Sequence, residues 1–223
     1  MGMILQSEAI VLNSVRYSDS QSIVNLYSEQ KGRLAVLVRI SKKKGRGKMS
    51  ALFQPLTIIK ADLSISNKRE IQTIKDFDTI FVPYHILGDI KKTAIATFLT
   101  ELLSKLLYDE QAYQSKYIYL QQSIQLLDYS TEKITNFHII FLLQFTKFLG
   151  IWPDQNDPFL LNLGDKYQMV DILLNTSIRD NHMIQFTDSE RSFILQEILK
   201  YYQLHFTELK GLKSLQVLHD VFS

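Results

Sequence analysis

The stretch EAIVLNSVRYSDSQSIVNLYSEQKGRLAVLVRI, residues 8–40, decides the fold of the amino-terminal third of the chain. It contains three short runs rich in Ile, Val and Leu, at Glu8 to Arg16, Gln21 to Ser28 and Arg33 to Ile40, with polar turns between them. Apolar runs of this length between polar turns are typical of β-strands. We therefore expect this part of the chain to form a sheet.

Two further runs extend the series, LTIIKADLS at Leu56 to Ser64 and IQTIKDF at Ile71 to Phe77, and Asn67-Lys68-Arg69 forms the turn between them. Five short strands without intervening helices fit a small closed barrel or a compact antiparallel sheet. The sequence predicts a five-stranded OB-type barrel.

Beyond Tyr84 the apolar residues recur at steps of three and four, which indicates helices with a buried stripe. The predicted helices are Ile90 to Tyr108, Tyr113 to Leu127, Ile134 to Leu149, Ser189 to Leu204 and a short one after Gly211. Gly150 is expected to end the third of these, and Thr187 with Glu190 to form a capping box at the start of the fourth.

Residues 154–185 are less regular, and we expect a hairpin there around Leu163-Gly164-Asp165. The domain boundary is expected near Val82-Pro83, where the hydrophobic period changes. The fold class is therefore α+β. An OB-fold barrel over residues 1–82 precedes a helical domain over residues 83–223, with a small irregular or hairpin insertion at about residues 151–186.

The chain has no cysteine, which excludes disulfides and zinc sites built on thiolates. Its apolar runs are shorter than the roughly 18 residues that a membrane span needs, and its start, MGMILQSEAI, lacks the features of an export signal. We expect a cytoplasmic protein with no metal and no cofactor.

The overall charge of +2 hides an asymmetry. Residues 1–80 hold 13 Lys or Arg against 7 Asp or Glu, whereas the remainder holds 12 against 16. Such asymmetry is typical of a polyanion-binding module joined to a differently employed one. The positive charge is densest in RISKKKGRGK, residues 39–48, and a solvated lysine-rich loop is the alternative interpretation.

The predicted DNA-binding residues combine this cluster with nearby strand ends. Lysines and arginines can neutralise phosphates, and the glycines let the loop follow a flexible backbone. Tyr17 is the aromatic residue that we expect to be exposed and to stack on bases, whereas Tyr27, Phe53 and Phe77 fit a core role better. The set comprises Arg16, Tyr17, Arg33, Arg39, Lys42, Lys43, Lys44, Arg46 and Lys48.

No motif of a known catalytic site is present. Gly45-Arg46-Gly47-Lys48 is too short for a phosphate-binding loop, the five histidines form no HExxH pair, and there is no GxSxG sequence. We therefore expect no enzymatic activity, although residues far apart in sequence can still converge in a folded chain.

The order of motifs resembles the RecO family of bacterial DNA repair proteins, which are recombination mediators. The matching segments are Glu8-Ala9-Ile10-Val11-Leu12, Arg16-Tyr17-Ser18-Asp19, residues 27–33, Ala51-Leu52-Phe53-Gln54-Pro55-Leu56, residues 148–154 (FLGIWPD) and residues 209–214 (LKGLKS). The resemblance spans nearly the whole chain.

The resemblance implies an OB-fold followed by a helical domain. It implies binding of single- and double-stranded DNA, annealing of complementary strands and, with the partner RecR, loading of the recombinase RecA onto DNA coated by single-stranded DNA-binding protein. The helical domain would receive the acidic carboxy-terminal tail of that coating protein, with Lys116, Lys133 or Lys147 as candidate contacts. Many relatives carry a four-cysteine zinc site in the region of residues 154–185, which this chain cannot form.

The leading hypothesis is a non-catalytic DNA-binding mediator associated with the nucleoid. An adaptor whose basic loop binds an acidic protein is the alternative, and a nucleic-acid hydrolase is a third possibility.

Overall fold

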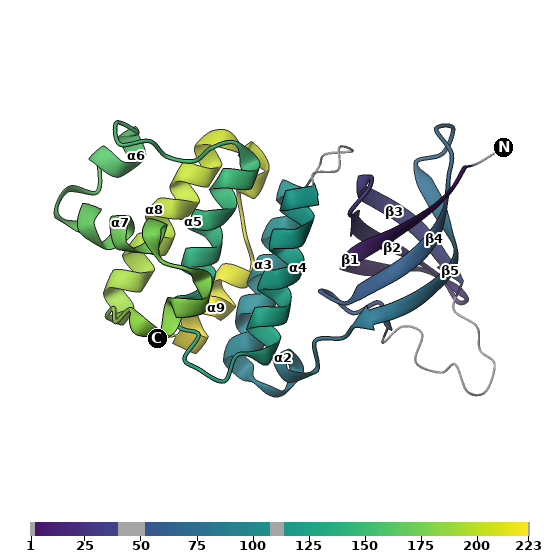
Figure 1. The fold of residues 1–223 in the computed structure, drawn as a ribbon, viewed down its shortest axis with the longest axis horizontal. Helices are drawn as coiled ribbons and strands as arrows, with labels where there is room; N and C mark the ends of the chain where they lie inside the picture. The colour runs from purple at the N-terminus through teal and green to yellow at the C-terminus, as the bar shows by residue number, and fades with distance from the viewer. Residues whose placement is uncertain (1–2, 40–51, 108–113, 223) are drawn as a thin grey trace. The chain divides into compact units, whose positions relative to one another are not determined.

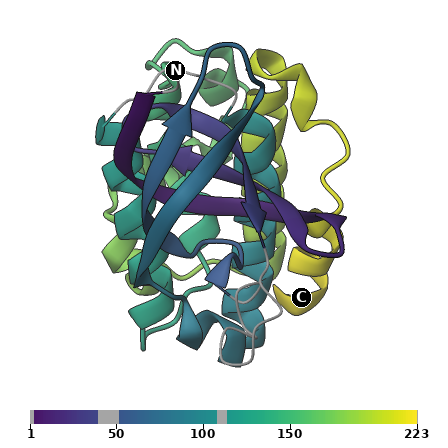
Figure 2. The same ribbon diagram turned by 90° about the vertical axis from the view of Figure 1, so that its right-hand side faces the viewer.

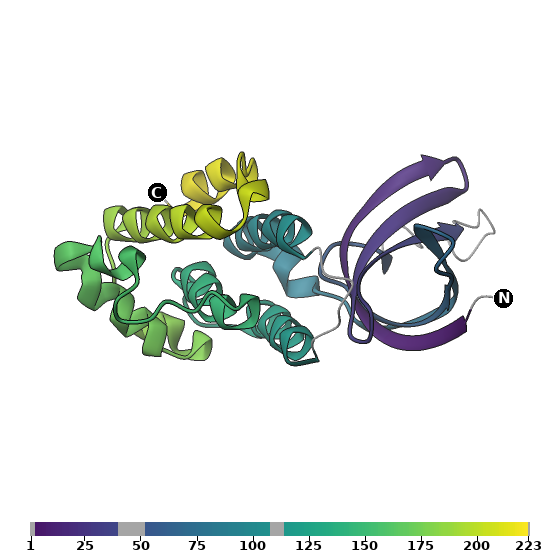
Figure 3. The same cartoon turned by 90° about the horizontal axis from the view of Figure 1, so that it is seen from above.

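The computed structural model describes residues 3–39, 52–107 and 114–222. Its amino-terminal part is a closed barrel of five strands in the order β1-β2-β3-β5-β4, which Figure 3 shows end-on. The strands are β1 (Met3–Ser18), β2 (Gln21–Ser28), β3 (Gly32–Arg39), β4 (Ile58–Ile65) and β5 (Ile71–Phe81). All neighbouring strands are antiparallel except β3 and β5. Five strands closed in this way form an OB-fold, so the predicted fold class is confirmed.

The barrel interior is filled by alternate residues of the strands, as the two-residue period of a strand requires. In β2, Val24 and Leu26 face inward, and in β3, Val36 and Val38 do the same. The remaining interior residues are small or aliphatic, apart from Phe53 at the entry to β4: Ala9, Val11, Ile59, Ala61 and Leu63. The residues that alternate with these inward ones therefore point out of the barrel.

The helices follow the barrel in sequence (Figure 1). Their bounds are α2 (Tyr84–Gly88), α3 (Ile90–Leu106), α4 (Gln114–Tyr129), α5 (Phe137–Leu149), α6 (Pro158–Leu161), α7 (Tyr167–Asn175), α8 (Asp188–His205) and α9 (Ser214–Phe222), with 3-10 turns η1 (Gly164–Lys166), η2 (Ile178–Met183) and η3 (Thr207–Leu209). No helix among the described residues is long and apolar enough to cross a membrane.

The chain divides into two compact units. One consists of Met1–Tyr84 with Leu103–Ile124, and the other of His85–Leu102 with Gln125–Ser223. The end of α3 and the first part of α4 therefore belong with the barrel. Within that unit, the Glu8 carboxylate of β1 accepts hydrogen bonds from Tyr117 and Gln121 of α4.

The second unit is built around α5, which is buried along almost its whole length. Gly150 ends α5 with a φ of 73°, a conformation that glycine adopts without strain, as predicted. The predicted capping box is also confirmed, because the Thr187 side chain accepts from the Glu190 N–H while the Glu190 carboxylate accepts from the Thr187 N–H.

The predicted hairpin around Leu163-Gly164-Asp165 is wrong. The segment forms α6, η1 and α7 instead, and it buries Phe159, Leu163 and Leu173. The three- and four-residue spacing of its apolar side chains suits helices, and Gly164, read as a hairpin turn, begins η1 with a φ of 55°.

Packing and hydrogen bonds hold this segment. The Tyr201 hydroxyl donates to the Ile151 carbonyl at 2.7 Å and to the Asp157 carboxylate at 3.1 Å, and its ring stacks on Phe159 at 4.7 Å. The Gln144 amide donates to the backbone carbonyls of Leu174, in the last turn of α7, and Thr176, just after it. A zinc site does not fit here, since the chain has no cysteine and the described residues include no cluster of three or more potential metal ligands.

Candidate nucleic-acid interface

The hairpin between β1 and β2 carries two of the predicted residues close to its tip. Arg16 and Tyr17 lie directly before the turn formed by Asp19 and Ser20. The Arg16 guanidinium pairs with the Asp19 carboxylate at 2.6 Å, and both side chains are so exposed that the pair adds little stability. Tyr17 is 65% exposed, which confirms the exposure predicted for it. Its ring is therefore accessible for stacking.

The sheet register brings Arg39 to the same end of the barrel. Gln21 of β2 pairs with Ser18 on one side and with Arg39 on the other. Two strand spacings place Arg39 about 10 Å from Ser18. Arg39 is exposed and leads directly into residues 40–51. The predicted cluster of Lys42, Lys43, Lys44, Arg46 and Lys48 lies outside the described residues.

A row of mainly aliphatic side chains crosses the outer surface of the barrel. Val15 pairs with Ile23, Ile23 with Leu37, and Leu37 with Thr73, so the row runs across β1, β2, β3 and β5. Val15 is exposed and the other three are half-buried. Figure 2 shows the strands of the barrel from another side. In OB-folds, this face and the β1–β2 and β4–β5 loops bind oligonucleotides.

The loop between β4 and β5 adds two basic residues to this face. Lys68 and Arg69 are exposed, and β5 begins beside β3, where Ile71 pairs with Ala35. The buried Gln72 side chain holds the loop, because its amide accepts from the Ser66 N–H and donates to the carbonyls of Ser66 and Arg69. The sequence predicts only a turn at these residues, although two adjacent basic residues in a loop that OB-folds use for binding are an available signal.

Arg33 has a different position from the other predicted DNA-binding residues. Its guanidinium donates to the backbone carbonyls of Ser104 and Leu107 at the end of α3. The last carbonyls of a helix lack intrahelical partners in general, and a cation there also opposes the negative end of the helix dipole. Arg33 is thus engaged in holding the first unit together, and we leave it out of the proposed interface.

The other aromatic residues near the barrel are packed. Tyr27 is fully buried, and Phe53 and Phe77 lie 4.7 Å apart, one inside the barrel and the other against it. Among these four aromatic residues, Tyr17 alone presents an exposed ring.

The three lysines suggested for partner binding lie in different surroundings. Lys116 is only 3% exposed, so it cannot offer its ammonium group at an open groove. Lys147 donates to Gln144 and lies over the Trp152 ring at 4.1 Å, an arrangement typical of a cation–π contact. Lys133 is exposed in the segment before α5. Lys116 belongs to the first unit, and Lys133 and Lys147 belong to the second.

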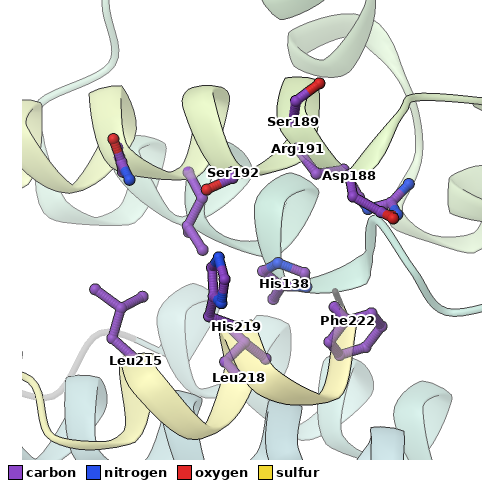
Figure 4. Close-up of a pocket in the computed structure, with 11 residues that line it drawn as sticks. His138, Asp188, Ser189, Arg191, Ser192, Leu215, Leu218, His219 and Phe222 are labelled. Atoms are coloured by element: carbon purple, nitrogen blue, oxygen red, sulfur yellow. The ribbon is translucent and has the colours of Figure 1, made fainter.

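The second unit contains a cavity of about 280 Å³ between α5, α8 and α9 (Figure 4). Its walls include four apolar side chains, those of Leu195, Leu215, Leu218 and Phe222. Polar side chains of α8 and the rings of His138 and His219 complete the lining. None of the three suggested lysines lines it.

Two buried nitrogen atoms in this cavity wall have no hydrogen-bond partner among the described residues, Nδ1 of His138 and Nε of Arg191. Burial, together with the smaller effect of the nearby Arg191 charge, lowers the pKa of His138 to about 3, so the ring is neutral at pH 7. The other guanidinium nitrogens of Arg191 bind the Phe186 carbonyl and the Asp188 carboxylate. The cavity thus joins apolar walls to unsatisfied polar atoms.

The barrel and its outer face define the class of protein: an OB-fold with exposed basic side chains at the β1–β2 hairpin and in the β4–β5 loop, joined to helices. Models of the amino-terminal and carboxy-terminal parts of recombination protein O match residues 1–82 and 87–158. The chain is 31% identical to the DNA repair protein RecO of Azobacteroides pseudotrichonymphae and to that of Bacteroides fragilis, and 28% identical to that of Phocaeicola vulgatus. Each comparison covers 99% of this chain and 100% of the relative. The chain belongs to the RecO family.

Proposed function

We propose that this chain is a non-catalytic, DNA-binding recombination mediator in DNA repair. The observation that carries the proposal is the outer face of the barrel, where exposed basic residues lie on both sides of an aliphatic row. Arg16 and Arg39 are at one end, and Lys68 and Arg69 are in the β4–β5 loop. Membership of a family whose relatives are called DNA repair proteins supports the same role.

A single DNA strand would lie across this face. Its phosphates would contact the basic side chains, and a base would stack on Tyr17, a contact worth on the order of 1 to 3 kcal/mol. The basic residues at 42–48 would add further phosphate contacts. Because such contacts do not distinguish bases, binding would be independent of sequence and strongly weakened by salt. Double-stranded DNA would bind through the same phosphate contacts.

Annealing follows from the same chemistry. Two complementary strands repel each other through their phosphates, and bound basic side chains reduce that repulsion. Base pairing supplies the free energy, so no nucleotide hydrolysis is needed. With RecR as partner, we propose that the protein acts on strands coated by single-stranded DNA-binding protein and thereby helps RecA to load.

The cavity between α5, α8 and α9 is the proposed binding place for the tail of single-stranded DNA-binding protein. An acidic tail with an apolar end matches apolar walls beside the guanidinium of Arg191. The unsatisfied Nε of Arg191 and Nδ1 of His138 support this choice over the three separate lysines. The proposal concerns the second unit alone.

The mediator function is tested by annealing of complementary strands, with and without single-stranded DNA-binding protein. Wild-type protein should accelerate annealing in both conditions, and the variant R16A/R39A/K68A/R69A should be slow in both. A protein that binds no labelled single-stranded DNA at low salt, or that anneals bare strands only, would show that the mediator proposal is incorrect. DNA cleavage in the presence of divalent metal would contradict the non-catalytic assignment.

The proposed tail site is tested separately with a labelled tail peptide. Leu215→Asp places a carboxylate in the cavity wall, whereas Val217→Asp adds the same charge to an exposed position of α9 outside that wall. Peptide affinity should fall at least tenfold for Leu215→Asp and remain close to wild type for Val217→Asp. Equal affinities for the two variants would place the tail elsewhere.

A further inference from the structure

The Asp188 carboxylate and the Arg191 guanidinium form an ion pair in the wall of the cavity between α5, α8 and α9. Both residues belong to the start of α8, three positions apart, and Figure 4 labels both among the side chains that line the cavity. They differ in burial, because the Arg191 side chain is 14% exposed and the Asp188 side chain is 63% exposed. The cation is thus held in the wall, whereas its anion has room to turn into solvent.

The ion pair uses only part of the hydrogen-bonding capacity of the guanidinium. Nη1 of Arg191 donates to the Phe186 carbonyl, and Nη2 donates to Oδ1 of Asp188. Nε of Arg191 is buried and has no hydrogen-bond partner among the described residues. Nε and Nη2 share one edge of the planar guanidinium, to which a carboxylate can bind through two parallel hydrogen bonds. Asp188 therefore occupies this edge through Nη2 alone and leaves the Nε–H unsatisfied.

A carboxylate that enters from the cavity is not restricted in the same way. Asp188 is attached to the same helix as Arg191, which limits how its carboxylate can turn, whereas a ligand carboxylate can place one oxygen on each N–H of the edge. A buried N–H without a partner costs free energy, so a ligand that satisfies Nε gains what Asp188 does not. The ligand displaces little in return, because an ion pair with an exposed partner contributes little stability.

We propose that Asp188 is an internal competitor for the ligand of this cavity. Its carboxylate covers the free edge of Arg191 until the terminal carboxylate of an apolar-ended peptide displaces it. The inference rests on the proposed function, which assigns the tail of single-stranded DNA-binding protein to this cavity, and it adds a residue that sets the affinity. A small anion that does not fill the apolar part of the cavity competes poorly with Asp188, so the ion pair also gives selectivity.

Asp188→Asn tests the competition, because asparagine keeps the size of the side chain and removes its charge. The affinity for a labelled tail peptide with a free terminal carboxylate should rise about two- to fivefold, the range expected for the loss of an exposed ion pair. Glu208→Gln removes the same charge from an exposed position of the same unit outside the cavity wall, and should leave the affinity at its wild-type value. No gain for Asp188→Asn, or equal gains for both variants, would overturn the proposal.

Two further measurements show whether the gain depends on the guanidinium edge. With the same peptide carrying a terminal amide, Asp188→Asn should bind no better than wild type. In an Arg191→Lys background, which keeps the positive charge but lacks two parallel N–H groups, Asp188→Asn should also give no gain. Thermal unfolding checks that Arg191→Lys folds, and the amide peptide needs no such variant. A gain of equal size with the amide, or in the lysine background, would mean general charge repulsion and would overturn the proposal.

The variants of α9 separate this inference from the proposed tail site. If Leu215→Asp weakens tail binding while Asp188→Asn leaves it unchanged, the cavity holds the tail and the competition by Asp188 is refuted. If Leu215→Asp and Val217→Asp bind the tail equally well, the tail site itself is wrong and the competition is refuted with it.

Discussion

Arg16 and Arg33 look equivalent in the sequence, but their replacement should have different effects. Replacing Arg33 should lower the stability of the protein, whereas replacing Arg16 should reduce the salt dependence of DNA binding. Arg33→Met keeps the length of the side chain but removes the hydrogen bonds to the Ser104 and Leu107 carbonyls. Hydrogen bonds from a charged group contribute about 1.5–3 kcal/mol, and a cation at a helix carboxy terminus adds about 0.3–1 kcal/mol. We expect the free energy of unfolding to fall by about 2–3 kcal/mol, which lowers Tm by about 4–12 °C in a protein of this size.

Arg16→Ala is the matched comparison. The pair between Arg16 and Asp19 is exposed on both sides, so its loss should change the free energy of unfolding by less than about 1 kcal/mol. The same variant should lose one phosphate contact, which reduces the salt dependence of single-stranded DNA binding by about 0.7 in log–log slope.

Thermal unfolding gives a Tm for each variant, and DNA titration at several salt concentrations gives a salt slope for each. Arg33→Met should lower Tm and leave the salt slope unchanged, whereas Arg16→Ala should leave Tm nearly unchanged and reduce the salt slope. An Arg33→Met protein with wild-type Tm and a reduced salt slope would refute the structural role assigned to Arg33.

Two further predictions concern the second unit. The pKa of His138 is about 3 in the folded chain and about 6.5 when unfolded, so below pH 6.5 the unfolded chain takes up a proton that the folded chain does not. Stability should therefore fall as the pH is lowered from 6.5 toward 3, by up to about 1.4 kcal/mol per pH unit, and urea unfolding of His138→Gln should lack this component. Tyr201→Phe keeps the stacking on Phe159 but loses the hydroxyl bonds to Ile151 and Asp157. Urea unfolding should therefore show that the free energy of unfolding falls by about 1–2 kcal/mol. An unchanged free energy of unfolding would mean that packing alone holds the segment.

The barrel was predictable because its residues alternate in a way that only a strand satisfies. Val24 and Leu26 or Val36 and Val38 point inward, and polar turns separate the runs. The helices were predictable from their three- and four-residue spacing and from local signals such as Gly150. Residues 158–175 were not, because Gly164 in a polar context also matches a hairpin turn, and the burial of Leu163 and Leu173 depends on partners distant in sequence.

The site was predictable only in part. The exposure of Tyr17 followed from its place at a strand end. The difference between Arg16 and Arg33 did not, because each lies at the end of a run, and only the fold brings the end of α3 to Arg33. Lys68 and Arg69 became candidates once the order of strands placed the β4–β5 loop at the binding face of an OB-fold.

The salt dependence of DNA binding by Lys68→Ala/Arg69→Ala tests the central claim most directly. If the barrel face holds the DNA, loss of two phosphate contacts should reduce the log–log slope for single-stranded DNA by about 1.4. Arg179→Ala/Lys200→Ala removes the same charge from exposed positions of the helical unit and should leave the slope at its wild-type value. A wild-type slope for Lys68→Ala/Arg69→Ala, or equal reductions in both double variants, would contradict the account.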